Sequence, residues 1–367
     1  MDISRKNQEQ VAGDNSTQNQ VVGDNTHQVI IDTQNNTVTH NSYTITSIPA
    51  SEIVTLTTTV STQVTQQALA LCTQVAEKTV LARMNAFEQV WTPRISSMEN
   101  VVSHLTDPKF QFMIRDANIT AAKSTRAEDL NMLSELLACH IEKGSDIKID
   151  AGINRAINIV NEVDIDSLCA LTIVLAITNI IPTSGNANAG LKLLNDLYAK
   201  LLICTLPEGD VWIDNLNVVG AINIQSGNFK KIDKLITSKL DGYVCAGIKS
   251  GTEEHKQALE ILRNHGYADS VLAQNDFLPN HVRLTTVDLS SLKPELKPIA
   301  DLYSKDQASL DVVKANFMSM WDSYEILRVI HEWFDNIPIF FRINSVGKAL
   351  AQTNAKRCYP SFPDLIK

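Results

Sequence analysis

The chain has 367 residues, of which 44% are hydrophobic, so it can bury a full core and is long enough for about two or three domains. Its 41 Asp and Glu residues outnumber its 32 Lys and Arg residues, and the formal net charge is −9. This balance argues against nonspecific binding to nucleic acid or an anionic membrane, both of which rely on a basic surface, although it is compatible with a local basic patch.

A repeat of ten residues opens the chain. Residues 10–19 read QVAGDNSTQN and residues 20–28 read QVVGDNTHQ. Each copy places an apolar pair before Gly-Asp-Asn, whose residues suit tight turns, so each copy is predicted to form a strand, a turn and a strand. One copy of the chain has little to bury here, because Val11, Val21 and Ile31 form a single thin apolar stripe. Residues 1–48 are therefore predicted to form a β-helix-like or β-prism-like arm that assembles as a homotrimer.

The residues expected to carry this assembly are the apolar stripe and the turn positions of the repeat. They are Val11, Gly13, Asn15, Val21, Gly23, Asn25, Ile31 and Asn35.

Residues 49–92 are predicted to form a connecting helix or stalk. Neither glycine nor proline occurs between residues 53 and 90. An apolar stripe with the spacing four, three, four runs through Val64, Ala68, Leu71 and Val75. This is coiled-coil spacing, but it stops at Lys78 and Thr79, so an ordinary amphipathic helix is expected to follow the stalk.

The body is predicted to be mainly α, with one helical domain over residues 93–246 and a second helical subdomain over residues 247–367. Helices are expected at 96–106, 109–122, 127–143, 150–162, 165–180, 187–205, 230–240 and 253–265, and two more near 310–333 and 346–355. A short β element is expected at residues 282–287.

The stretch from Arg342 to Ala351 resembles the strand-to-helix end of some winged-helix proteins, with Asn344 and Ser345 as a capping pair. Nearby basic residues, such as Lys348, are offset in sequence by Asp322, Glu325, Glu332 and Asp335. We therefore expect a winged-helix-like packing module that does not read nucleic acid.

The sequence contains no recognisable catalytic, cofactor or metal motif. The six cysteines include no C-x-x-C pair, and the His331-Glu332 pair lacks the second histidine of a zinc site. Residues 246–252 (AGIKSGT) lack the spacing of a phosphate-binding P-loop. Carboxylate pairs such as Asp146 and Asp150 stand at expected helix starts, where they complement the helix dipole. No cofactor or metal is expected, and the catalytic residues of any enzyme remain unknown.

The location is predicted to be cytoplasmic. The N-terminus lacks the apolar stretch of a signal peptide, and the most apolar run, residues 168–182, is shorter than a membrane span. Dispersed cysteines are typical of reduced thiols in a cytosol.

The chain resembles an uncharacterised bacterial family in which a Gly-Asp-Asn repeat precedes an all-helical body. The resemblance lies in the repeat and in the segments DPKFQF (107–112), RDA (115–117), LSELL (133–137) and AINIV (156–160). It implies architecture and assigns no residue a role. Similar repeat arms are attached to varied domains of bacterial conflict and anti-phage proteins.

The leading hypothesis is a non-enzymatic, homo-oligomeric assembly or sensor protein that engages an unknown protein partner in bacterial anti-phage defence. One alternative is an enzyme whose site is assembled from residues distant in sequence. A further alternative is a prophage structural or fibre-associated protein.

Overall fold

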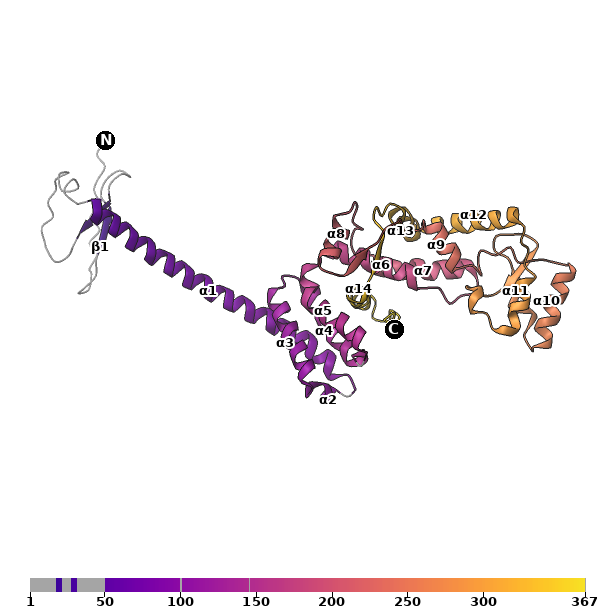
Figure 1. The fold of residues 1–367 in the computed structure, drawn as a ribbon, viewed down its shortest axis with the longest axis horizontal. Helices are drawn as coiled ribbons and strands as arrows, with labels where there is room; N and C mark the ends of the chain where they lie inside the picture. Colours follow the sequence, from indigo (N-terminus) through magenta and orange to yellow (C-terminus); the bar gives the residue numbers. More distant parts are fainter. Residues whose placement is uncertain (1–17, 22–27, 32–49, 100, 145, 367) are drawn as a thin grey trace, which may run out of the picture. The chain divides into compact units, whose positions relative to one another are not determined.

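The computed structural model describes residues 18–21, 28–31, 50–99, 101–144 and 146–366 (Figure 1). The fold is mainly helical, as predicted. Internal contacts divide the chain into two units, residues 1–75 and 76–367, and each unit is described by itself. In the described part of the chain, no helix is long and apolar enough to cross a membrane.

Two short strands lie within the predicted arm. Strands β1 (Gln18–Val21) and β2 (Gln28–Ile31) pair antiparallel, with Val21 opposite Gln28 and Gln18 opposite Ile31. Their first residues are ten apart, which is the period of the sequence repeat. The predicted assembly residues Val11, Gly13, Asn15, Gly23, Asn25 and Asn35 lie outside the described residues, so the arm beyond this strand pair stays a prediction.

One helix, α1 (Ala50–Ser96), covers the predicted connecting helix and continues through Pro93. Every side chain from Cys72 to Ala82 is exposed. From Arg83 onward the helix packs onto the body. Arg83 Nη1 donates to the carbonyl oxygen of Ala122 at 2.9 Å, and Phe87 is fully buried.

Seven further helices build the first half of the body. They are α2 (Val101–Leu105), α3 (Pro108–Lys123), α4 (Ala127–Lys143), α5 (Ile147–Ile159), α6 (Ile165–Asn179), α7 (Ala187–Leu201) and α8 (Val211–Val218), with a 3-10 turn, η2 (Val160–Glu162), after α5. Helix α6 is buried at every position from Ser167 to Ile177, so it is the central helix of the core. Asp146, which the sequence placed at a helix start, caps α5, and Asp164 caps α6.

A second, smaller hydrophobic cluster runs from Cys245 to Tyr303. It follows α9 (Ile232–Lys239) and contains β4 (Ile248–Lys249), α10 (Glu253–Asn264), β5 (Leu272–Gln274), β6 (His281–Leu284) and α11 (Lys297–Asp301), with 3-10 turns η3 (Asp269–Val271), η4 (Leu289–Ser291) and η5 (Pro294–Leu296). The three strands form an antiparallel sheet in the order β4-β6-β5. Strand β6 overlaps the β element expected at residues 282–287.

The chain then returns to the first core through α12 (Gln307–Ser323) and α13 (Glu325–Asp335), which bury Phe317, Trp321 and Phe334 there. The second cluster thus begins close to the predicted boundary at residue 247, but residues beyond 303 pack with the first core.

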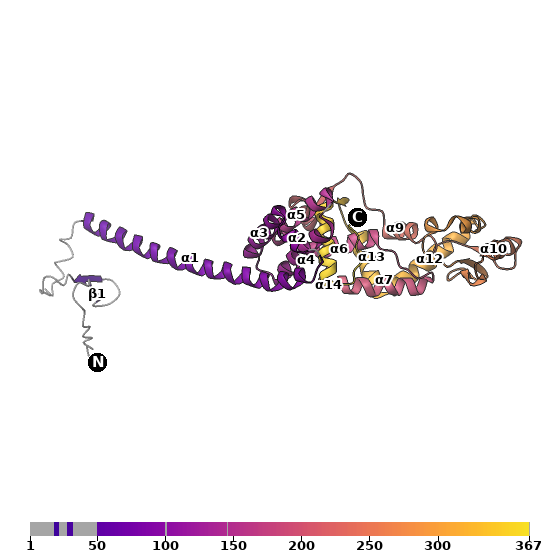
Figure 2. The same ribbon diagram turned by 90° about the horizontal axis from the view of Figure 1, so that it is seen from below.

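The last helix, α14 (Ser345–Cys358), packs against α4, α5 and α6 (Figures 1 and 2). Strand β7 (Phe341–Ile343) leads into it and pairs antiparallel with β3 (Ile222–Ile224). Asn344 caps α14 and also donates through Nδ2 to the carbonyl oxygen of Gly220 at 2.8 Å. The predicted strand-to-helix segment and its cap are confirmed, and they tie the end of the chain to residues 220–224.

Candidate functional site

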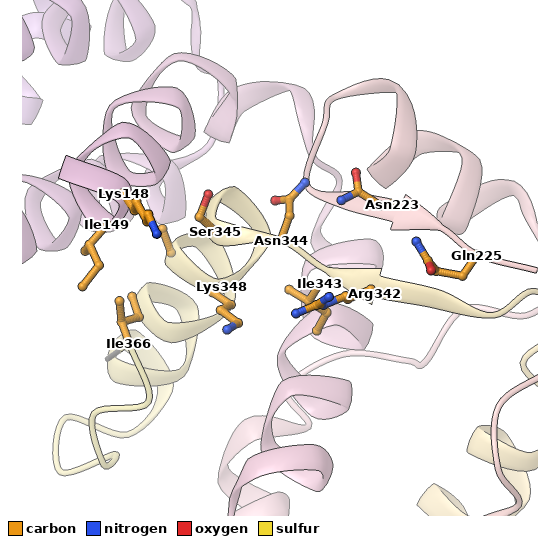
Figure 3. Close-up of a pocket in the computed structure, with 11 residues that line it drawn as sticks. Lys148, Ile149, Asn223, Gln225, Arg342, Ile343, Asn344, Ser345, Lys348 and Ile366 are labelled. Atoms are coloured by element: carbon orange, nitrogen blue, oxygen red, sulfur yellow. The ribbon is translucent and has the colours of Figure 1, made fainter. Parts of the chain in front are cut away.

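A cavity of about 360 Å³ opens where α14, α5 and the β3-β7 strand pair meet (Figure 3). Three basic side chains line it. Lys148 comes from the first turn of α5, Arg342 from the middle of β7, and Lys348 from the first turn of α14. The remaining lining residues are Ile149, Asn223, Gln225, Ile343, Asn344, Ser345, Ala349 and Ile366.

Among the residues that the structure describes, no Asp or Glu side chain lines this cavity. Lysines elsewhere on the neighbouring helices do have acidic partners. Lys143 pairs with Asp364, and Lys356 lies 3.8 Å from Glu142. Within the described residues, none of the three cavity cations forms such an ion pair. In a chain of net charge −9 this is a local reversal of sign, which favours an anionic ligand at this cavity.

The polar groups of the cavity differ in whether they are free to bind. The Asn344 Oδ1 atom accepts from the N–H groups of Val346 and Gly347 at 3.0 and 3.1 Å, so it serves the helix cap. Asn223 pairs with Arg342 in the strand register, which places both on one face of the strand pair. Because the cap occupies the helix N–H donors, the attraction for an anion comes from the side chains.

A second cavity, of about 540 Å³, adjoins the first and shares Gln225, Arg342, Ile343 and Lys348 with it. Its lining is mostly apolar. The ring of Phe229 makes edge-to-face contacts with Phe334, Phe340 and Phe341 at centroid distances of 5.3, 4.9 and 5.1 Å. The other lining residues are Val174, Leu175, Thr178, Asn179, Asn228, Lys230 and Leu235. Arg342 and Lys348 therefore stand between a basic cavity and an apolar one.

The best candidate for acid–base chemistry lies elsewhere, in the buried pair His140 and Asp150. Their Nδ1 and Oδ1 atoms are 2.6 Å apart, and the His140 ring stacks on Phe110. Burial lowers the pKa of His140, and it raises the pKa of the adjacent Cys139 thiol to about 11. The Cys139 thiol therefore stays protonated, and a protonated thiol is a poor nucleophile that His140 does not activate. The pair of His140 and Asp150 is better explained as a hydrogen-bonded part of the core.

No metal centre is present in the part of the chain that the structure describes, because no three His, Cys, Asp or Glu side chains converge there. The three cations of the basic cavity are suited to binding an anionic ligand.

Of the assembly residues predicted from the repeat, the structure places Val21 in β1 and Ile31 in β2. The predicted offset of Lys348 by nearby acids does not hold at the cavity. Asp322 accepts from the His331 ring at 2.7 Å, Asp335 caps the N–H of Ile232, and neither lines the cavity.

Sequence reasoning missed the grouping of Lys148 with Arg342 and Lys348, because Lys148 precedes Arg342 by 194 residues (342 − 148). The only local signal was the capped strand-to-helix junction, which the basic residues Arg342 and Lys348 flank.

Comparison with known proteins gives a family and no activity. One family model, of an uncharacterised family, matches residues 55–366, a match that begins after the repeat. No curated protein and no solved structure matches the chain.

Proposed function

The chain belongs to the family of this model, and on that premise we propose that the protein is a non-enzymatic, homo-oligomeric sensor. Its N-terminal region assembles copies of the chain, and its helical body engages a partner or ligand at the basic cavity.

The observation that carries the proposal is the exposed part of α1. Val80 and Leu81 have 38% and 58% of their surface exposed, and they lie in a stretch, Cys72 to Ala82, whose side chains are all exposed. Helices in proteins gain most of their stability from packing an apolar face, and an isolated stretch is marginal in water. Packing α1 alongside its copies would bury these side chains and supply that stability.

The basis for proposing assembly through the arm is the ten-residue repeat of the sequence. An arm with a thin apolar stripe gains a core when three copies combine their stripes, so we propose a homotrimer held by residues 1–48 and by α1.

The chemistry of the cavity supports proposing a sensor role rather than an enzymatic one. Among the described residues, its lining offers cations, carboxamides, aromatic rings and the hydroxyl groups of Ser345 and Thr178, but no carboxylate, histidine or thiol to activate a hydroxyl. By analogy with other proteins that carry repeat arms, we place this sensor in bacterial anti-phage defence. Neighbouring restriction genes would support that setting, whereas neighbouring phage tail genes would favour a prophage fibre component.

Mass measurement in solution tests the assembly. Light scattering on the full chain should give a trimer, and a chain lacking residues 1–48 should give a lower order. A monomeric full chain, or an unchanged mass after the deletion, would overturn the proposal.

Crosslinking locates the interface on α1. Cys72 is the only exposed cysteine among the six, so a thiol-specific bismaleimide should join copies of the wild-type chain through it. Cys72→Ser is the matched control and should abolish the crosslinked band. A band that persists in this variant would place the contact elsewhere.

A further inference from the structure

We propose that the two adjoining cavities bind a nucleoside phosphate, with its phosphate among Lys148, Arg342 and Lys348 and its base in the phenylalanine-lined cavity. This inference rests on the sensor role proposed above and names the class of ligand that the site takes.

The number of cations favours a phosphate over a carboxylate. A carboxylate carries one negative charge, which one cation balances, and it would leave two of the three cavity cations uncompensated. A phosphate monoester carries a charge of about −1.5 to −2 near neutral pH and offers three acceptor oxygens, and further phosphate groups add to both. Arg342 also presents a planar guanidinium group, which matches two phosphate oxygens at once.

The position of these cations favours one ligand that spans both cavities. Arg342 and Lys348 line the basic cavity and the apolar cavity alike. Figure 3 shows the Arg342 guanidinium extending toward the side of the cavity from which Lys348 projects. A phosphate held at this boundary would direct the group attached to it into the second cavity.

The second cavity suits a planar heterocycle. The Phe229 and Phe340 rings offer apolar contact for a base, as aromatic side chains do in nucleic acid binding. Gln225, Asn228 and Asn179 each contribute a carboxamide, which can both donate and accept hydrogen bonds, as the edge of a base requires. The Asn179 Nδ2 atom already donates to the carbonyl oxygen of Leu175 at 2.9 Å, which leaves its Oδ1 atom as an acceptor.

The size of the cavities fits the same ligand. Volumes of about 360 and 540 Å³ fall within the range of sites for small molecules, roughly 300–1,000 Å³. An acyl chain would also fit the apolar cavity, but it would bring one charge to three cations and leave the carboxamides unused.

Calorimetric titration of the full chain tests the ligand class. The probes are AMP, ADP, ATP and GTP, together with inorganic phosphate, adenosine, palmitate and a single-stranded oligonucleotide. At least one nucleoside phosphate should bind more tightly than inorganic phosphate and adenosine, since it alone fills both cavities. The proposal is overturned if no nucleoside phosphate binds more tightly than about 1 mM, or if phosphate, palmitate or the oligonucleotide binds more tightly than all of them.

Substitutions at the exposed residues Arg342 and Lys348 and at the half-buried Phe340 test the placement. Arg342→Gln and Lys348→Gln should each weaken binding about tenfold, since each removes a charge-assisted hydrogen bond. Phe340→Leu keeps the cavity apolar but removes a ring, and it should weaken nucleoside phosphate binding at least about fivefold without affecting the response to phosphate. Lys314→Gln, on the exposed face of α12, is the matched control and should bind as wild type does. Equal affinity in Arg342→Gln and wild type would refute the site.

The mass of the complex separates this inference from the sensor role. A nucleoside phosphate that binds with these substitution effects but changes neither the mass nor partner binding would uphold the ligand class and overturn the sensor role. A trimer that binds no nucleoside phosphate would overturn the ligand class and leave the proposed assembly in place.

Discussion

Gly347→Ala tests whether the close approach of α14 to the residue before β3 holds the candidate site together. A Cβ atom built on Gly347 would lie 2.1 Å from the carbonyl oxygen of Ala221, whereas real Cβ contacts are essentially never shorter than 3.0 Å. Either α14 or the backbone at residue 221 would have to move by roughly 1 Å in a close-packed region. That movement would also displace Lys348 and Asn344 relative to β7.

Two opposing effects set the magnitude. Replacing glycine with alanine inside a helix stabilises it by up to about 1 kcal/mol, whereas overpacking a core costs about 1–3 kcal/mol. The upper part of that range applies here, because the clash is with a backbone atom of a fully buried residue and not with the flexible end of a side chain. We expect a net loss of about 1–2 kcal/mol, which lowers Tm by about 2–8 °C.

Scanning calorimetry measures the change in Tm, and urea unfolding checks it independently. Lys348→Ala is the control, since it alters the next, exposed position of α14 without crowding Ala221. A Tm for Gly347→Ala equal to or above that of the wild type would show that helix propensity outweighs the clash, and that α14 is not held in the way we describe.

His140 should make stability depend on pH, because burial lowers its pKa below the ordinary value of 6.5. The unfolded chain then binds a proton that the folded chain does not, so the free energy of unfolding should fall as the pH drops from about 7.5 to about 5.5, and fall less in His140→Gln. Urea unfolding at both pH values measures this, and equal losses in the two proteins would contradict it. Arg94→Gln should cost about 1 kcal/mol, since it removes two contacts with Glu135, at 2.7 and 3.2 Å, that tie α1 to α4. A double-mutant cycle with Glu135→Gln checks it, and a coupling energy near zero would count against the pair. Val21→Asp places a charge in the predicted stripe of every copy and should sharply weaken assembly in light scattering. Wild-type assembly in that variant would mean that the stripe faces solvent.

Local chemistry in the sequence was enough to locate most helices. Helix α4 spans residues 127–143, as predicted, and α6, α10 and α14 begin or end within a few residues of their predicted limits. These helices are long enough to show an apolar period, and capping residues such as Asp164 and Asn344 mark where they start. Helix α8 was missed, because its eight residues span barely two turns and show little periodicity.

Apolar periods and capping residues could not predict which strands pair when the strands are distant in sequence. The sequence suggested two short β elements in the body, at residues 282–287 and before the last helix, whereas the structure forms a three-stranded sheet and the separate β3-β7 pair. Strands of two to four residues have too few positions to show alternation, and their partners are chosen by tertiary packing rather than by neighbours in the chain.

The charged residues show most clearly which properties the sequence determines and which the tertiary structure decides. The sequence by itself determined a mainly helical body, a repeat at its start, the capped junction before α14 and a net charge of −9. Net charge is a sum that ignores the positions of the charges. In the sequence, acids close to Lys348 seemed to neutralise the charge of this lysine. Only the tertiary structure decided that Asp322 and Asp335 bind other partners, and that Lys148 is brought from α5 to join Arg342 and Lys348 at a cavity lined by no Asp or Glu side chain of the described residues. The physical reason is that electrostatic interaction depends on separation in space, which folding alone sets.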